Sequence, residues 1–253
     1  MMIDNPWFYA AAIPAVILFG ISKGGFGGSF GGIAVPLIAL VVSPLQATAI
    51  LLPILCLMDI QALIIYRGRW AWRELRILAP ASLLGIGVGT LIFEYMSPAF
   101  IRLILGIVSI VFTLNHWIYL ITKDNLERPT YPPVIGLIAG ATAGFTSFIA
   151  HAGAPPLDMY LLRRNLDRTA FVGTTVGFFA IVNYVKLVPY AWLGQLDLSN
   201  LSTALALSPF APVGVGLGVW LHKRTSDRIF FHLVYTLLFV VGLKLLYDGV
   251  TGL

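Results

Sequence analysis

The chain has 253 residues, of which 58% are hydrophobic and only 11% are charged. A soluble domain carries about 25% charged residues, so the composition excludes an ordinary soluble protein and indicates an integral membrane protein. The net charge of +5 at pH 7 comes from Lys and Arg confined to short joins between apolar segments, which argues against a nucleic-acid-binding surface.

Hydrophobic runs predict two sets of helices in chain order. The first set is expected at residues 6–22, 30–42, 46–66, 75–94 and 98–121. The second set is expected at residues 132–150, 154–163, 168–191, 200–221 and 228–250. A membrane span needs about 20 mostly apolar residues. The segments 30–42 and 154–163 are too short to cross alone, so we expect half-helices that return from a break in the chain.

The two breaks resemble each other. Around the first, Gly20, Gly24, Pro36 and Leu37 recur 120 positions later as Gly140, Gly144, Pro156 and Leu157. Further on, Pro80, Gly85, Gly87 and Gly89 recur as Pro209, Gly214, Gly216 and Gly218. Paired, interrupted apolar segments in two halves of a chain point to the binding site of a transporter. Glycines also let membrane helices pack closely, and this second interpretation stays open.

The basic joins predict the topology. They contain Arg67, Arg69, Arg73 and Arg76; Arg163, Arg164 and Arg168; and Lys223, Arg224 and Arg228. Placing these joins in the cytoplasm puts both termini on the non-cytoplasmic side. The two halves then run in opposite directions. We therefore expect an all-α polytopic helical bundle of two inverted-topology repeats, residues 1–121 and 132–253, joined by a cytoplasmic linker at 122–131.

Ionisable groups at membrane depth are costly and are functional candidates by default. The candidates for substrate binding are Lys23, Gly24, Gly28, Ser29, Gly31, Gly32, Ser147, His151, Gly153, Asn183 and Lys186. Two lysines, a histidine and two half-helix N-termini favour a small anion as the cargo. Asp59 and Asp158 are candidates for ion coupling.

Each ionisable candidate also has a purely structural interpretation. Lys23 and Lys186 could extend to a membrane surface, and Asp59 could pair with a neighbouring cation. His151 could be an ordinary hydrogen-bonded histidine, and Asp158 could be hydrated at the cytoplasmic mouth.

Motifs for catalysis and cofactor binding are missing from the sequence. It contains no Walker loop, no HExxH motif and no paired cysteines, and the single Cys56 excludes an intrachain disulfide. We therefore predict a protein that is not an enzyme, with no cofactor and no metal site. Transport without a nucleotide site would run downhill or on an ion gradient.

The glycine-rich run at 25–37 (Gly-Phe-Gly-Gly-Ser-Phe-Gly-Gly-Ile-Ala-Val-Pro-Leu), Asp59 with Tyr66-Arg67, the Gly140/Gly144 pair and Asn183/Lys186 resemble the sulfite exporter TauE/SafE family. The resemblance covers essentially the whole chain. It implies a membrane transporter of sulfite, sulfoacetate or another organosulfonate, with residues 24–36 and 144–156, Asn183 and Lys186 lining the pathway. The second break departs from the family pattern, because His151-Ala-Gly-Ala-Pro-Pro156 replaces a more glycine-rich run.

The sequence as a whole thus predicts a secondary transporter of the inner cell membrane that exports a small sulfur-containing oxyanion by alternating access. The expected partners are the small anionic substrate and membrane lipid, with no nucleic acid, and a homodimer is left open. Two alternatives remain. One is a transporter of metal cations or other small solutes, and the other is a membrane enzyme or assembly factor that transports nothing.

Overall fold

The computed structural model describes residues 3–93, 95, 97–121, 131–161, 163–164, 166–224 and 227–252. All regular structure in these residues is helical. Helices suit apolar segments that water does not reach, because every backbone N–H and C=O group can form its hydrogen bond within the helix. The long helices are α1 (Pro6–Phe26), α3 (Pro44–Ile65), α4 (Trp72–Phe93), α5 (Pro98–Ile121), α6 (Pro133–Ala150), α8 (Arg168–Trp192) and α11 (Asp227–Thr251). The shorter ones are η1 (Gly31–Ile33), α2 (Ala34–Ala39), α7 (Ala154–Leu161), α9 (Leu198–Leu207) and α10 (Phe210–Arg224).

Several helices begin where the sequence supplies a cap. The side chains of Asn5, Ser43 and Asp167 accept backbone N–H bonds at the starts of α1, α3 and α8. Proline follows Asn5 and Ser43 directly, and its missing N–H costs nothing in the first turn of a helix. Polar residues therefore fix the ends of segments whose interiors are apolar.

Five of the described helices are long and apolar enough to cross a membrane: α1, α3, α4, α6 and α8. The pair α9 and α10 qualifies as a sixth span, bent by 45°. Here the structure differs from the single helix expected at 200–221. The break includes Pro209, which cannot donate a helical hydrogen bond, although its match Pro80 lies inside the unbroken α4.

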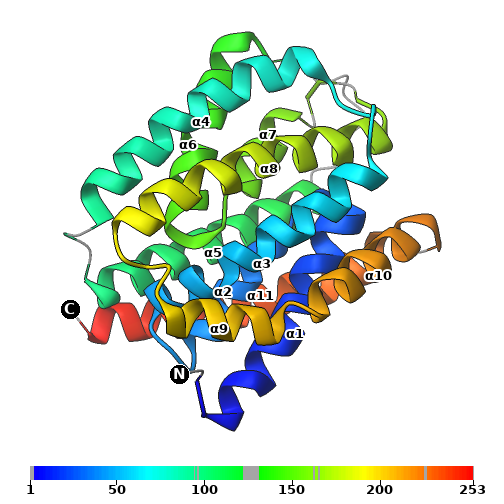
Figure 1. The fold of residues 1–253 in the computed structure, drawn as a ribbon. Helices are drawn as coiled ribbons and strands as arrows, with labels where there is room; N and C mark the ends of the chain where they lie inside the picture. The colour runs from blue at the N-terminus through cyan, green and yellow to red at the C-terminus, as the bar shows by residue number, and fades with distance from the viewer. Residues whose placement is uncertain are drawn as a thin grey trace.

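Two hairpins enter the bundle from opposite ends (Figure 1). In the first, α1 runs into the bundle and α2 returns towards the end where both chain termini lie. In the second, α6 enters from the other end and α7 returns to it. The tip of the first hairpin turns at Gly27 and Gly28, whose φ angles of 66° and 88° are readily adopted only by glycine.

The two hairpins differ in the length of their helices and turns. Helix α1 continues to Phe26, four residues beyond the expected end, so Lys23 lies in the last helical turn rather than in the break. Helix α6 ends at Ala150 as expected, and His151 caps it in a left-handed conformation with φ 49°. The expected half-helices are present as η1 with α2 and as α7. The expected linker 122–131 lies outside the described residues except for Tyr131.

Three helix pairs pack most extensively: α1 with α10, α4 with α6, and α5 with α11. Their backbones approach closely because glycines lie at the crossings. A Cβ atom on Gly24 would lie 2.3 Å from the carbonyl oxygen of Val215, and one on Gly85 would lie 1.9 Å from that of Ala141. At the α1–α10 and α4–α6 crossings, glycines therefore do allow close helix packing, which is the alternative function considered for them above.

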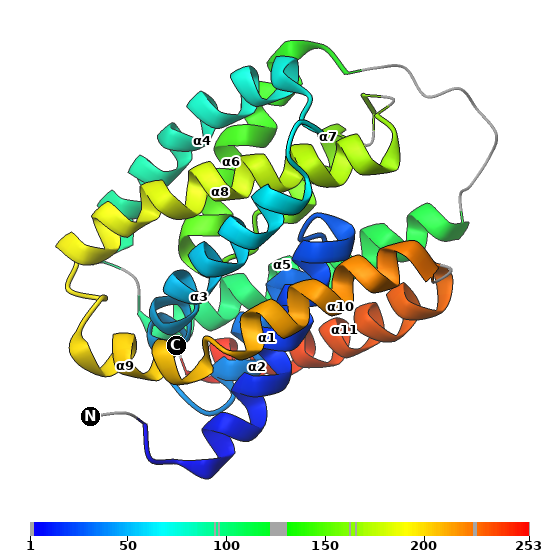
Figure 2. The same ribbon diagram turned by 45° about the vertical axis from the view of Figure 1, so that its right-hand side comes forward.

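Helices α3 and α8 pack against each other near the centre of the bundle (Figure 2). The C-terminal ends of α3, α7 and α10 lie at one end of the molecule (Figure 2). The termini and the joins that follow α2 and α8 lie at the opposite end. Large apolar side chains cover the outside, among them Leu84, Leu91, Val188 and Leu205, each more than 70% exposed. Such a surface suits lipid, so the chain is a multi-pass membrane protein.

Candidate functional site

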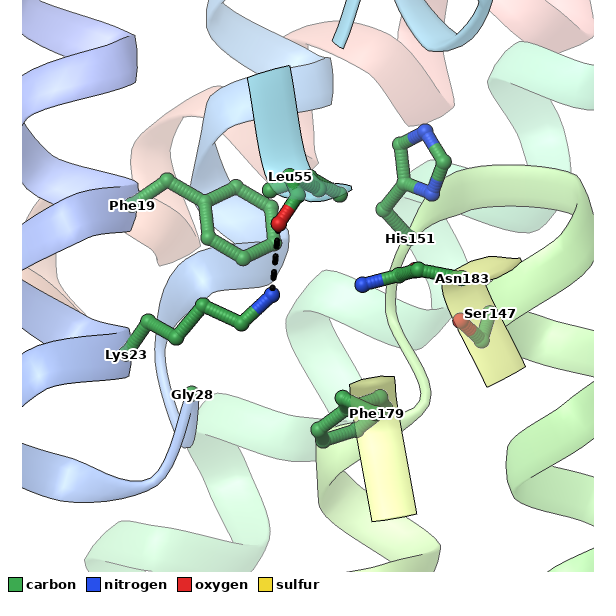
Figure 3. A pocket seen from close by; sticks show the side chains of 8 residues that line it. All are labelled: Phe19, Lys23, Gly28, Leu55, Ser147, His151, Phe179 and Asn183. Carbon is green, nitrogen blue, oxygen red and sulfur yellow. Dashed lines mark hydrogen bonds between the residues drawn. The ribbon is translucent and has the colours of Figure 1, made fainter. Parts of the chain in front are cut away.

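A small cavity lies where both hairpins meet α3 and α8 (Figure 3). Its volume of about 10 Å³ is enough for about one water molecule. Its walls are formed by Phe19, Lys23, Gly28, Leu55, Ser147, His151, Phe179 and Asn183. The cavity thus combines a hydrophobic wall with a cation, an amide, a hydroxyl and an imidazole.

The residues around the cavity come in pairs spaced by four positions, which places both members of a pair on one face of a helix. Three of the four helices supply one apolar and one polar residue each, and α6 supplies two polar residues. The pairs are Phe19 and Lys23 on α1, Leu55 and Asp59 on α3, Ser147 and His151 at the end of α6, and Phe179 and Asn183 on α8. Four helices are therefore needed to build the site.

Lys23, Asp59 and Asn183 form one buried cluster. The Lys23 ammonium lies 2.6 Å from Oδ1 of Asp59 and donates a 3.3 Å hydrogen bond to the carbonyl oxygen of Leu55. The side-chain amide of Asn183 donates a 2.7 Å bond to the other carboxylate oxygen, Oδ2 of Asp59. Asp59 is fully buried and Lys23 is 2% exposed, so Lys23 does not extend to a membrane surface.

Lys186, Ser147 and His151 form a second buried cluster. The Lys186 ammonium donates 3.0 Å bonds to the carbonyl oxygen and to Oγ of Ser147, and it lies 2.8 Å from Nδ1 of His151. Nε2 of His151 lies 2.9 Å from the carbonyl oxygen of Thr48. Because a carbonyl only accepts, Nε2 carries the proton and Nδ1 accepts from Lys186. The imidazole is therefore neutral in this arrangement.

Lys186 stands behind the cavity rather than in its wall. It is fully buried and is not part of the lining, and its ammonium group contacts Ser147 and His151, which are. Oγ of Ser147 accepts from Lys186, so its hydroxyl proton remains able to donate into the cavity. Lys186 can thus act on a bound molecule through Ser147 and through its charge.

Asp158 lies on α7, apart from both clusters. It is only 7% exposed, so it is not a solvent-exposed residue of the kind expected at a hydrated cytoplasmic mouth. Its side chain interacts with that of Ser29 on the other hairpin, and the Ser29 hydroxyl is 2.7 Å from the carbonyl oxygen of Phe26. Oδ1 of Asp158 has no hydrogen-bond partner among the described atoms. Asp158 and Ser29 therefore link the two hairpins outside the cavity.

The candidate glycines divide between the cavity and the helix crossings. Gly28 lines the cavity, and a Cβ on Gly32 would lie 3.4 Å from the Cβ of Ala152, so the two hairpin tips meet there. Gly24 packs on α10, as described above. A Cβ on Gly31 would lie 2.5 Å from the Phe19 ring.

Gly153 fills a tight position within the second hairpin. A Cβ atom there would lie 2.5 Å from the carbonyl oxygen of Ala143 and 2.9 Å from Cβ of Ser147. Gly153 consequently holds α7 close to α6, next to the residue that presents a hydroxyl to the cavity.

The structure brings Lys23, Gly28, Ser147, His151 and Asn183 to one cavity. Sequence reasoning missed the apolar half of the lining, namely Phe19, Leu55 and Phe179. Their signal is the four-residue spacing from a polar candidate, which is hard to recognise among so many apolar residues. The carbonyl of Thr48, which fixes the His151 tautomer, leaves no signal in the sequence.

Arg164 has a structural role that the sequence did not suggest. It was expected to mark the cytoplasmic side, yet its guanidinium pairs with Glu74 at the start of α4, with 2.9 Å contacts to Oε1. It also donates a 2.8 Å bond to the carbonyl oxygen of Tyr131, and the Tyr160 hydroxyl donates a 2.7 Å bond to Oε2 of Glu74. These contacts anchor the base of the α6–α7 hairpin to α4.

Within the described ranges, no group of three or more His, Cys, Asp or Glu side chains could hold a metal ion. The alternative of a metal-cation transporter thus has no ligand cluster to support it in that part of the chain. The buried cations and hydrogen-bond donors around the cavity instead suit an anion.

Comparison with known proteins identifies the family. No curated protein and no solved structure matches the chain. The family model of the sulfite exporter TauE/SafE matches residues 12–245, which include every residue of the cavity and both hairpins except the first six residues of α1. That family consists of membrane transporters rather than enzymes. The chain belongs to the sulfite exporter TauE/SafE family.

Proposed function

We propose that this protein exports a small sulfur-containing oxyanion, sulfite or a small organosulfonate, through the cavity between the two hairpins. The observation that carries the proposal is the buried cavity lined by Lys23, Asn183 and Ser147. These residues present an ammonium group, an amide and a hydroxyl to the same space. Charge-assisted hydrogen bonds from such donors are the usual means of holding an oxyanion.

Lys186 and His151 complete the proposed site. Lys186 adds a positive charge behind Ser147, and His151 lies in the wall with its tautomer fixed by Thr48. Together the two buried clusters contain two ammonium groups, on Lys23 and Lys186, and one carboxylate, on Asp59. A net positive interior favours an anion and disfavours a cation.

Two inverted repeats, residues 1–121 and 132–253, account for the arrangement of the site. Several features support them. The helix-capping residues Gly27 and His151 lie 124 positions apart, and so do Asp59 and Asn183. The packing of α1 from the first repeat on α10 from the second has its counterpart in the packing of α6 from the second repeat on α4 from the first.

Alternating access follows from these two hairpins in the proposal. A cavity of about 10 Å³ is too small for an oxyanion of four or more heavy atoms, so loading requires the hairpin tips to separate. Each hairpin enters from its own end of the bundle (Figure 1) and would open the site to that end. Transport would be driven by an ion gradient, in the inner membrane, with both termini on the non-cytoplasmic side.

The test is flux through the purified protein in liposomes. Vesicles loaded with ³⁵S-labelled sulfite, sulfoacetate or methanesulfonate should release at least one of these anions faster than protein-free vesicles, and Mn²⁺ or Zn²⁺ should not move. Movement of metal ions without any oxyanion would favour the cation alternative. A protein that moves no solute would favour the alternative of a membrane enzyme or assembly factor.

A further inference from the structure

Asp59 occupies the donors that a substrate anion would need. Lys23 and Asn183 both line the cavity, and they point towards each other from opposite walls (Figure 3). Asp59 is not part of the lining, yet one of its carboxylate oxygens contacts the Lys23 ammonium and the other accepts the Asn183 amide bond. A single internal carboxylate thus engages the two donors in the way an oxyanion would.

We propose that Asp59 is an internal competitor of the substrate and takes up a proton when the substrate displaces it. This inference rests on the proposed function, since it concerns the same cavity. An oxyanion that takes the N–H groups with which Lys23 and Asn183 now contact Asp59 replaces the carboxylate at both donors. The displaced carboxylate would remain fully buried without its counter-ion, which is strongly unfavourable for an ionised group.

Protonation of the displaced Asp59 removes this free-energy cost, because the buried side chain is then uncharged. Before substrate binding, the two clusters hold the Lys23 and Lys186 ammonium groups and the Asp59 carboxylate. With a monoanion bound and Asp59 protonated, the substrate supplies the negative charge that Asp59 has lost. The buried charge is the same in both conditions, so one anion and one proton move together and the transport step is electroneutral.

Comparison of Asp59 with the titratable groups around it identifies Asp59 as the group that takes up and releases this proton. The titratable groups that face it are Lys23 from α1, Cys56 from its own helix, and Tyr184 and Lys186 from α8. Lys186 is held by Ser147 and His151 rather than by a carboxylate. Among these groups, Asp59 alone loses both partners when an oxyanion takes the two donors.

The experiment uses methanesulfonate, whose sulfonate stays ionised at every working pH, in liposomes with a clamped membrane potential and an internal pH dye. For the parent protein we expect about one proton to move with each anion and the flux to be insensitive to potential. Asp59→Asn keeps the size of the side chain but cannot take up the proton. Its flux should lose the accompanying protons and become dependent on potential.

Anion affinity should also change in Asp59→Asn, rising at least about tenfold, because the substrate no longer competes with a charge-assisted hydrogen bond. Asp248→Asn is the matched control, since it removes a carboxylate that is also paired with a lysine but does not line or adjoin the cavity, and it should keep the parent's proton coupling. If Asp59→Asn unfolds, calorimetry on the parent protein tests the same point. The heat of methanesulfonate binding, measured in two buffers of different ionisation enthalpy, should show that binding takes up about one proton.

The outcomes separate the two claims. Proton coupling that survives in Asp59→Asn, or binding without proton uptake by the parent, overturns the competitor role and leaves anion transport intact. If the parent moves neither methanesulfonate nor sulfite, the proposed function itself is wrong.

Discussion

Lys186 is an ammonium group in a fully buried position whose three protons all go to neutral acceptors on Ser147 and His151. Buried charges are normally paired with an opposite charge, because their desolvation is expensive. Lys23 has such a partner in Asp59, whereas Lys186 has none among the acceptors that hold it. A bound anion in the adjacent cavity would supply the missing negative charge.

Replacement of Lys186 by methionine tests this electrostatic role. Methionine keeps most of the apolar stem and removes the charge, so we expect oxyanion binding to weaken about tenfold or more, which corresponds to roughly 1.4 kcal/mol. The measurement is calorimetric or fluorescence binding with purified protein. Lys223→Met, at an exposed lysine, should bind like the parent. If Lys186→Met and Lys223→Met bind the oxyanion equally well, Lys186 serves only as a structural hydrogen-bond donor.

At the scale of the elements, glycines decide how closely the helices of each pair approach. A Cβ on Gly218 of α10 would lie 2.3 Å from the carbonyl oxygen of Ile21 on α1, whereas a Cβ on Gly216 would have nothing within 4 Å. The two glycines are neighbours on one helix and share its sequence environment. They differ in whether α1 packs against them.

Gly218→Ala should destabilise the protein by about 1–3 kcal/mol, the usual cost of overpacking. Gly216→Ala should be neutral or stabilising by up to about 1 kcal/mol, because alanine favours a helix over glycine. Thermal unfolding in detergent measures both variants. A lower melting temperature for Gly216→Ala than for Gly218→Ala would show that the α1–α10 crossing is not as close as described.

The elements were largely predictable from the sequence, because long apolar runs, caps and prolines act locally. The starts of α5 and α6 and the return of α7 follow such signals, and the exceptions have local causes. Helix α1 runs through Lys23 because glycines at 24 and 25 do not end it, and α9 and α10 separate at Pro209. The site was predictable only in part. Which of the glycines face the cavity depends on how the helices cross, and no local signal gives that.

The partner of Arg164 illustrates the same limit. Glu74 lies 90 positions from it and reads as an ordinary polar residue in the first turn of a helix. Only the packed structure brings it to Arg164, with 11% and 5% exposure of the two side chains. A pair this buried costs more to break than a surface pair such as Lys244 and Asp248, whose side chains are 58% and 30% exposed.

At the scale of the whole molecule, two hairpins from opposite ends close one cavity between them. Helices α3 and α8 supply the other walls with Leu55, Phe179 and Asn183. The base of the α6–α7 hairpin is anchored by the buried Glu74–Arg164 pair. At the other end, the residues before α1 contact α9 through a 3.4 Å bond from Ile3 to Thr203. Because the weaker contact lies at the end with the termini, we expect that hairpin to open more easily.

If the substrate passes through this cavity, a single cysteine in place of Ser147 should report its passage. Ser147→Cys in a Cys56→Ser background places a single thiol in the cavity wall, where Ser147 is 1% exposed. During transport the thiol should react with a small methanethiosulfonate reagent, sulfoacetate should slow that reaction, and the modified protein should no longer transport ³⁵S-labelled sulfoacetate. Undiminished flux through fully modified protein would contradict the account.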